Sequence, residues 1–166
     1  MDISKQHFIQ VVNANKGTIR SLCRLYYAEP EDQKDAHQDI ILQLWKSFGS
    51  FRGEAKINTW IYRIALNTLL TKIRRDKHRI DTEPLATNPN IEVGVADSHI
   101  ELLRMIIASL QPLDKAVVIL HLEGYQHKEI AQIMGISDSN VSTRFNRLKS
   151  KLKSQYYHKS HASRRP

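Results

Sequence analysis

The residues with the most recognisable chemistry lie in the segment EIAQIMGISDSNVSTRFNRLKSKL, from Glu129 to Leu152. A short stretch with helical apolar spacing, a Gly135-Ile136-Ser137 turn and a longer basic stretch follow one another here. This order is the signature of a helix-turn-helix, whose second helix enters the major groove of DNA. Glycine can take the left-handed conformation that closes the first helix, and serine can cap the second. The segment therefore predicts a DNA-binding site.

The second helix of this pattern has an inner and an outer face. Apolar residues recur at spacings of four, three and four, which places them on one buried side: Val141, Phe145, Leu148 and Leu152. The residues expected outside are Ser139, Ser142, Thr143, Asn146 and Arg147, with Arg144 at the boundary. Arginine can donate two hydrogen bonds to guanine or bind phosphate, while Asn, Ser and Thr suit adenine or the DNA backbone.

Further cations follow this face. Residues 137–166 hold eight Lys and Arg but one acid, Asp138. Five of those outside the predicted base-reading set are interpreted as either phosphate contacts or part of a solvated tail: Lys149, Lys151, Lys153, Arg164 and Arg165.

A second segment, SFRGEAKINTWIYRIALN from Ser50 to Asn67, has a distinctive pattern. It is similar to the promoter-melting segment of bacterial RNA polymerase sigma factors of the extracytoplasmic-function class. The residues that match are Phe51, Gly53, Thr59, Trp60, Ile61, Tyr62, Arg63, Ile64, Ala65 and Asn67. The helix-turn-helix segment also resembles the promoter-reading C-terminal domain of this class.

The resemblance implies a role in reading separated DNA strands, which needs an aromatic or apolar pocket for an extruded base and cations for the backbone. The loop from Phe51 to Asn58 is expected to capture a flipped base of the minus 10 element. Trp60 is either part of that pocket or only a core residue. The residues assigned to minus 10 recognition and melting are Phe51, Arg52, Lys56, Asn58, Trp60, Arg63, Asn67, Lys72, Arg74 and Arg75.

A third segment, KDAHQDIILQLW from Lys34 to Trp45, resembles the part of this class that grips the clamp coiled coil of RNA polymerase. The matching residues, which the resemblance assigns to polymerase binding, are Asp35, Gln38, Asp39 and Trp45. If Ala36, Ile40, Leu44 and Phe48 face inward, the two acids and the glutamine fall on or near the outer face. The class also implies contact with the polymerase flap and regulation by an anti-sigma factor.

Composition agrees with a polyanionic partner, because the net charge is +8 and the pI is about 9.7. The longest uncharged apolar run is too short to cross a bilayer and the N-terminus lacks a signal-peptide pattern, so we expect no membrane insertion and a cytoplasmic protein. The single cysteine, Cys23, is expected to be a buried structural thiol. Scattered histidines, no nucleophile-and-base pattern and no G-x-x-x-x-G-K-[ST] predict no metal site, no cofactor and no enzyme activity.

Apolar residues recur at helical spacing along most of the chain, which predicts an all-α fold. Residues 81–98 interrupt this pattern with two prolines, four acids and no Lys or Arg. We therefore expect two small helical domains joined by an extended linker: residues 1–80 (polymerase binding, minus 10 recognition and melting), 81–98 (linker), 99–157 (a four-helix domain with the helix-turn-helix, minus 35 recognition) and 158–166 (basic tail). Ser98 and Glu101 have the form of a capping box at the start of the second domain.

Together these patterns predict an alternative sigma factor that binds core RNA polymerase, recognises minus 10 and minus 35 elements and takes part in promoter melting. One alternative is an autonomous helix-turn-helix regulator with an N-terminal sensor or dimerisation domain. Another is an RNA-binding or structural helical protein. Neither alternative explains the segment from Ser50 to Asn67.

Overall fold

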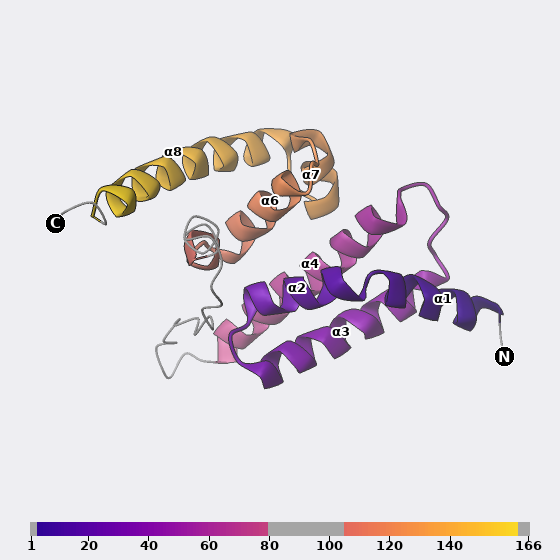
Figure 1. Ribbon diagram of the computed structural model, residues 1–166. Helices are drawn as coiled ribbons and strands as arrows, with labels where there is room; N and C mark the ends of the chain where they lie inside the picture. Colours follow the sequence, from indigo (N-terminus) through magenta and orange to yellow (C-terminus); the bar gives the residue numbers. More distant parts are fainter. Residues whose placement is uncertain (1–2, 80–104, 163–166) are drawn as a thin grey trace. The chain divides into compact units, whose positions relative to one another are not determined.

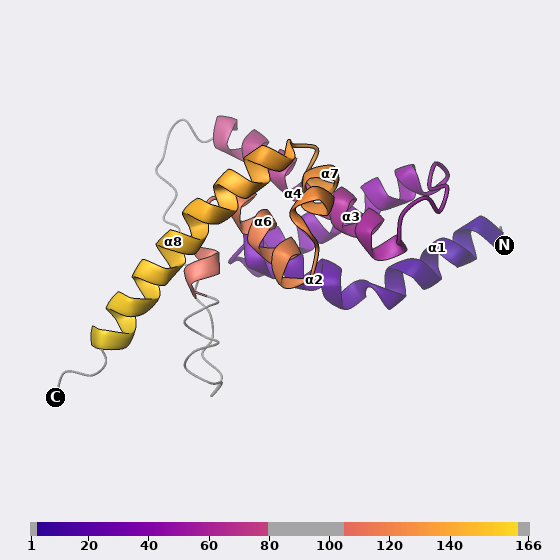
Figure 2. The same ribbon diagram turned by 90° about the horizontal axis from the view of Figure 1, so that it is seen from above.

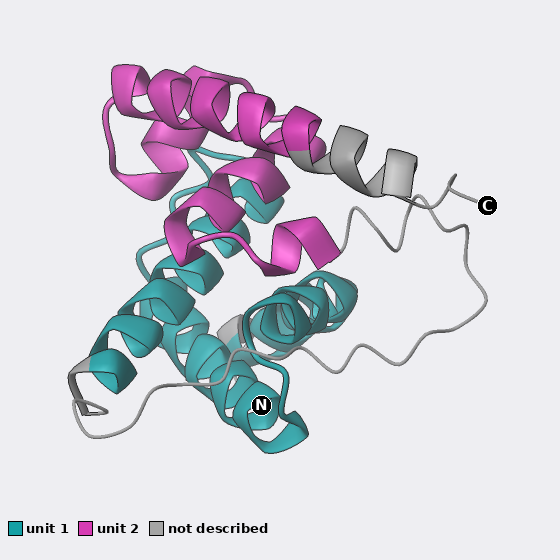
Figure 3. Ribbon diagram, turned by 90° about the vertical axis from the view of Figure 1, so that its left-hand side faces the viewer, with its two compact units in different colours: residues 1–91 teal, residues 92–166 magenta. Residues whose placement is uncertain are grey.

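The computed structural model describes residues 3–79 and 105–162 (Figure 1). Throughout these ranges the regular structure is helical, as the sequence predicts. The chain separates into two compact units, residues 1–91 (unit 1) and residues 92–166 (unit 2), coloured separately in Figure 3. The prediction of two helical domains is therefore confirmed. The expected linker at 81–98 and the expected capping box of Ser98 and Glu101 lie outside the described residues.

Unit 1 contains α1 (Ile3–Ala14), α2 (Lys16–Tyr26), α3 (Pro30–Phe48) and α4 (Ile57–Arg79). Helices α3 and α4 pack along each other, and α2 packs against both. Helix α2 follows α1 after a break at Asn15 (Figure 2). Helix α3 begins with Pro30 and two acids in its first turn, which suits the positive end of a helix, and it ends before Gly49.

The core of unit 1 is the apolar stripe predicted for α3, packed against α2 and α4. Ala36, Ile40 and Leu44 are fully buried, as are Ile61 and Ala65 of α4. Helix α2 contributes three further buried residues, Ile19, Leu22 and Cys23. Burial raises the pKa of the Cys23 thiol to about 11, since the charged thiolate is disfavoured away from water. The predicted structural role of this cysteine agrees with its position.

Unit 2 contains α6 (Pro112–Leu122), α7 (His127–Met134) and α8 (Asp138–Ala162), preceded by a helical stretch at residues 105–108. Every residue of α6 from Asp114 to Leu120 is buried, because α7 and α8 both pack against this helix. Helix α8 buries Val141 and Leu148 and half-buries Phe145, which matches the predicted inner face. It extends to Ala162, so the first part of the predicted basic tail is helical.

None of the helices within the described ranges is long and apolar enough to cross a membrane.

Candidate nucleic-acid interface and polymerase-binding face

The turn between α7 and α8 has the geometry that the sequence predicts. Gly135 has a φ of 66°, a left-handed conformation that residues with a Cβ rarely adopt. The hydroxyl of Ser137 accepts a hydrogen bond from the backbone N–H of Asn140 at 3.2 Å, which caps α8. Helix α7 starts with a capping box that the sequence analysis missed, in which Glu129 accepts a bond from the backbone N–H of Gln126 at 2.7 Å. Gly135 and Ser137 thus fix the end of α7 and the start of α8, where the two helices meet.

The outer face of α8 carries most of the predicted base-reading residues. Ser139, Thr143, Asn146 and Arg147 are exposed. Ser142 departs from the expectation, because it is half-buried and its hydroxyl lies 3.3 Å from Nδ1 of His127. Its position three residues before the inner Phe145 turns it towards α7 rather than towards solvent. Ser142 therefore supports the packing of the motif more directly than it can reach DNA.

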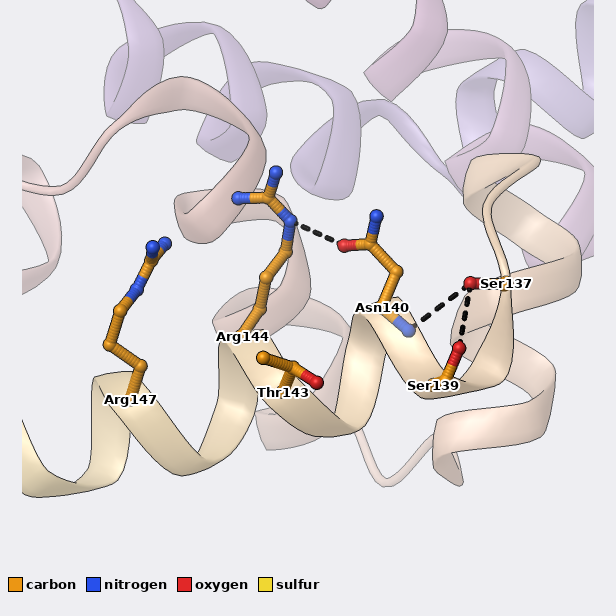
Figure 4. Close-up of a pocket in the computed structure, with 6 residues that line it drawn as sticks. All are labelled: Ser137, Ser139, Asn140, Thr143, Arg144 and Arg147. Carbon is orange, nitrogen blue, oxygen red and sulfur yellow. Dashed lines mark hydrogen bonds between the residues drawn. The ribbon is translucent and has the colours of Figure 1, made fainter.

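The two arginines of α8 share a carboxylate that the sequence analysis did not single out. Asp114 lies in the first turn of α6 and its side chain is 8% exposed. Its Oδ1 accepts a hydrogen bond from Nη1 of Arg144 at 2.7 Å, and its Oδ2 accepts one from Nη2 of Arg147 at 3.1 Å. Asn140 holds Arg144 from the other side, since its Oδ1 accepts a bond from Nε at 2.7 Å (Figure 4).

These contacts hold the two guanidinium groups beside Asp114 and Asn140. An open hollow of about 410 Å³ lies beside them, lined by Ser137, Ser139, Asn140, Thr143, Arg144 and Arg147 (Figure 4). Asp114 and Asn140 were not among the predicted site residues. The sequence does contain a signal for Asp114, which is an acid two residues before the apolar run Ala116–Leu120 in a helix with no other acid.

Aromatic rings stabilise the same region from inside unit 2. The ring of Phe145 lies 4.2 Å from that of His121 and 4.9 Å from that of His127, measured between centroids. Across the described residues, no group of three or more His, Cys, Asp or Glu side chains could hold a metal ion. We therefore interpret these two histidines as packing residues of the α6–α7–α8 junction.

In unit 1, the predicted base-capturing loop is backed by aromatic rings in tilted and edge-on contact. The ring of Phe51 lies 5.1 Å from that of Trp60, and Trp60 lies 6.1 Å from Phe48 in an edge-on contact. Trp60 is half-buried, so it is partly a core residue and partly accessible from the loop. Gly53 turns the loop with a φ of 73°.

Most of the polar and charged residues predicted for the strand path are exposed: Arg52, Lys56, Asn58, Arg63, Asn67, Arg74 and Arg75. Lys72 differs from them. Its side chain is 16% exposed and its ammonium lies 2.9 Å from the carboxylate of Asp39. Lys72 thus joins α4 to α3 by an ion pair.

This ion pair also changes the interpretation of the predicted polymerase-binding face. Asp35 and Gln38 are exposed, whereas Asp39 is 40% exposed and forms the ion pair with Lys72. Trp45 is 45% exposed, with its ring 5.0 Å from that of Phe8 in α1. Leu42, on the same helix, is 48% exposed and was not predicted. Helix α3 therefore presents acids, an amide and apolar surface together.

Comparison with known proteins gives matches to both units. The Sigma-70 region 2 family matches residues 11–79, and the Sigma-70 region 4 family matches residues 100–152. The RNA polymerase sigma factor YlaC of Bacillus subtilis is 30% identical over 160 residues, covering 84% of this chain and 92% of YlaC. The ECF RNA polymerase sigma factor SigM of Mycobacterium tuberculosis is 28% identical over 151 residues, covering 87% of this chain and 74% of SigM.

Solved structures share the fold. The sigma factor RpoE of Bartonella quintana, solved with the anti-sigma factor NepR, superposes with a TM-score of 0.67 at 19% identity and covers 92% of this chain and 96% of that one. CnrH, solved with the cytosolic domain of CnrY, gives a TM-score of 0.63 at 19% identity, with coverage of 93% and 90%.

The chain belongs to the sigma-70-like RNA polymerase sigma factors of the extracytoplasmic-function class. It is an alternative sigma factor that directs transcription initiation, and an autonomous helix-turn-helix regulator is not favoured. Sigma factors of this family are not catalytic enzymes.

Proposed function

We propose that the two units of this sigma factor divide promoter recognition between them. Unit 2 reads the minus 35 element through the outer face of α8. The observation that carries this assignment is that Thr143, Asn146 and Arg147 are exposed together on a helix whose opposite face is buried. A capped helix with exposed guanidinium, amide and hydroxyl groups suits the donor and acceptor pattern of the major groove.

Unit 1 contacts the minus 10 element as separated strands. Exposed cations on the loop and on α4 can follow the phosphate backbone, while the Phe51–Trp60 ring pair offers a surface on which a base can stack. Arg52, Lys56, Arg63, Asn67, Arg74 and Arg75 keep the strand-contacting role that the sequence assigns to them. Lys72 is reassigned to joining α3 and α4, because its ion pair with Asp39 neutralises it and most of its side chain is buried.

Helix α3 binds the clamp coiled coil of core RNA polymerase through Asp35, Gln38 and Trp45. Support comes from their exposure on one helix and from the mixed polar and apolar surface that they form with Leu42, since protein interfaces combine an apolar anchor with polar contacts around it. Contact between the polymerase flap and unit 2 is part of the same proposal. The protein acts by binding rather than by catalysis, and it acts in the cytoplasm, where promoter DNA and polymerase meet.

An anti-sigma factor is proposed as a further partner. RpoE of Bartonella quintana and CnrH were solved with NepR and with the cytosolic domain of CnrY. By analogy, a protein that covers the polymerase-binding surface of this chain would hold it inactive.

Run-off transcription with core polymerase on genomic fragments tests the proposal. Wild-type protein is expected to give defined transcripts, and Arg147→Ala is expected to weaken holoenzyme binding to the preferred minus 35 sequence by about 1 to 3 kcal/mol. Lys5→Ala is a matched control, because Lys5 is an exposed cation on α1 outside every predicted site. An equal loss on all DNA sequences would reduce Arg147 to a phosphate contact, and no defined transcript would contradict the proposed division of roles.

A further inference from the structure

Asp114 is placed where it can control DNA recognition without touching DNA. It belongs to α6, the central helix of unit 2, and its carboxylate is 8% exposed. A carboxylate removed from water is stabilised only when positive groups or hydrogen-bond donors surround it. Here the donors are the side chains of Arg144 and Arg147, both on the outer part of α8.

The contacts constrain the two arginines to different degrees. Arg144 is 28% exposed and is held at two points, by Asp114 at Nη1 and by Asn140 at Nε, both at 2.7 Å. Arg147 is 65% exposed and is held through Nη2 alone. A guanidinium has five N–H donors in a fixed fork, so each arginine keeps free donors after these contacts. Asp114 therefore orients the two guanidinium groups and leaves their other N–H donors available to a ligand.

The position of Asp114 in α6 adds to this assignment. It is the third residue of its helix, where an acid can bond the N-cap backbone, yet Gln111 and Asp114 form no side-chain cap. The carboxylate is turned instead towards α8. One negative charge shared between two guanidinium groups also lowers the positive charge that unit 2 presents to DNA of any sequence.

We propose that Asp114 is a positioning residue that sets minus 35 sequence discrimination by orienting Arg144 and Arg147, a role that rests on the proposed reading of the minus 35 element by α8. Bidentate recognition of a base edge depends on the direction of the guanidinium plane, whereas attraction to phosphate depends mainly on charge. Loss of Asp114 should therefore reduce discrimination between sequences and leave non-specific binding undiminished. A purely structural residue would weaken binding to all sequences alike.

The test uses holoenzyme formed from the full chain and bacterial core RNA polymerase, with a promoter library randomised in its minus 35 region. Sequencing of bound DNA gives the base preference, and binding to unselected library DNA gives the non-specific affinity. Asp114→Asn is expected to reduce discrimination at the affected base positions about tenfold. Binding to unselected DNA should be equal to wild type or tighter, because one negative charge has been removed.

Three companion variants separate positioning from charge and from folding. Glu123→Gln removes the same charge from an exposed position on the same unit and should leave the preference unchanged. Asp114→Glu keeps the charge, and an acid stays favourable at this position of the helix; its longer side chain shifts the guanidinium groups and should weaken discrimination about threefold. In an Arg144→Ala background, Asp114→Asn should reduce sequence discrimination less than it does in the wild type. The reason is that Asp114 acts partly through Arg144, which is already absent in that background.

Helicity and thermal unfolding of each variant are measured alongside. If Asp114→Asn unfolds unit 2, the minus 35 base preference of Asp114→Glu is used to test the role of Asp114. The role of Asp114 is wrong if the wild type shows a minus 35 preference that both folded variants keep, or if they lose affinity equally on all sequences. A wild-type profile without any base preference would instead contradict the assignment of α8 as the reader, and the Asp114 role with it.

Discussion

Arg144 and Arg147 are one helical turn apart, yet only one of them is largely open to solvent. Arg147 is 65% exposed, whereas Arg144 is 28% exposed and bonded on both sides. The sequence places Arg147 on the outer face and Arg144 at its boundary, and the exposures follow this order. Asp114 of α6 contacts both arginines, and its shorter bond, at 2.7 Å, is the one that it accepts from Arg144.

Next to Asp114 is another buried charged residue, Lys115, at 7% exposure. Burial lowers its pKa to about 8 from the usual value of 10.5. The folded protein therefore gives up this proton more readily than the unfolded chain. Below about pH 8 Lys115 is charged in the folded protein, and the full cost of burying that charge reduces the stability of unit 2. Between the folded and unfolded pKa values the penalty falls, so the stability of unit 2 rises with pH in this window.

We predict that Lys115→Met stabilises unit 2 at neutral pH by about 2 to 3 kcal/mol, because it removes the cost of burying a charge while keeping the length of the side chain. The gain should shrink at pH 9.5. Both tryptophans lie in unit 1, at positions 45 and 60, so thermal unfolding followed by tryptophan fluorescence serves as the internal control and should not change. Helicity melting reports both units, so a change in it that tryptophan fluorescence does not show belongs to unit 2. A gain that is the same at both pH values would show that burial of the charge is not its cause.

At the scale of elements, the helix-turn-helix depends on one backbone conformation. Gly135 has a φ of 66°, and a Cβ added there would meet nothing within 4 Å. Any cost of substitution must therefore come from the backbone and not from a clash.

Gly135→Ala is predicted to destabilise unit 2 by about 1 kcal/mol, the penalty for a left-handed alanine. Gly135→Asn should cost less, since asparagine tolerates this conformation. Thermal unfolding of the two variants, compared with Gly17→Ala in α2 as a helical control, measures the difference. Equal losses for Ala and Asn would contradict the backbone explanation.

Helix α3 combines the proposed polymerase-binding surface with an ion pair to α4, and the two nearby acids Asp35 and Asp39 differ in this respect. Asp35→Lys should weaken binding to core polymerase and leave the unfolding temperature of unit 1 unchanged, because Asp35 is exposed. Asp39→Lys should in addition lower unit 1 stability by about 1 kcal/mol, since it places an ammonium beside that of Lys72. Affinity for core enzyme and tryptophan fluorescence melting distinguish the two. Unchanged polymerase affinity in Asp35→Lys would remove α3 from the proposed interface.

For the whole molecule, promoter opening requires more free energy than the chain can supply. Separating on the order of ten base pairs costs about 14 kcal/mol, at ~1.4 kcal/mol for each stacked step. Stacking one or two captured bases on aromatic rings returns about 1 to 3 kcal/mol each. The remainder must come from the polymerase, so the chain is expected to select and hold an opened strand within the holoenzyme.

Exchanging residues 52–58 for a loop of equal length, with Phe51 kept to preserve its contact with Trp60, should change which minus 10 sequences support open complexes. The minus 35 preference should stay fixed, because α8, the proposed reader of duplex DNA, belongs to the other unit. Permanganate reactivity of unpaired thymines on a promoter library, alongside holoenzyme binding, measures both. An unchanged minus 10 preference, or an equal shift at minus 35, would leave this loop as a structural turn only.

The sequence alone determined the helices, the two-domain organisation and the family. Periodic apolar residues, Pro30, Gly49, Gly135 and Ser137 act over a few neighbouring positions, so their effects can be predicted without coordinates. Helix α7 ends directly before Gly135, as its pattern predicts. The outward position of Thr143, Asn146 and Arg147 follows from the same local periodicity.

Only the tertiary structure decided which charged groups are already paired. Lys72 and Asp39 are 33 residues apart, and Arg144 and Asp114 are 30 apart, so no local pattern connects them. Their pairing depends on how α3 packs on α4 and α6 on α8. Packing brings distant carboxylates within hydrogen-bond distance of these cations, and it thereby separates residues that hold the fold together from those that remain free to bind DNA or polymerase.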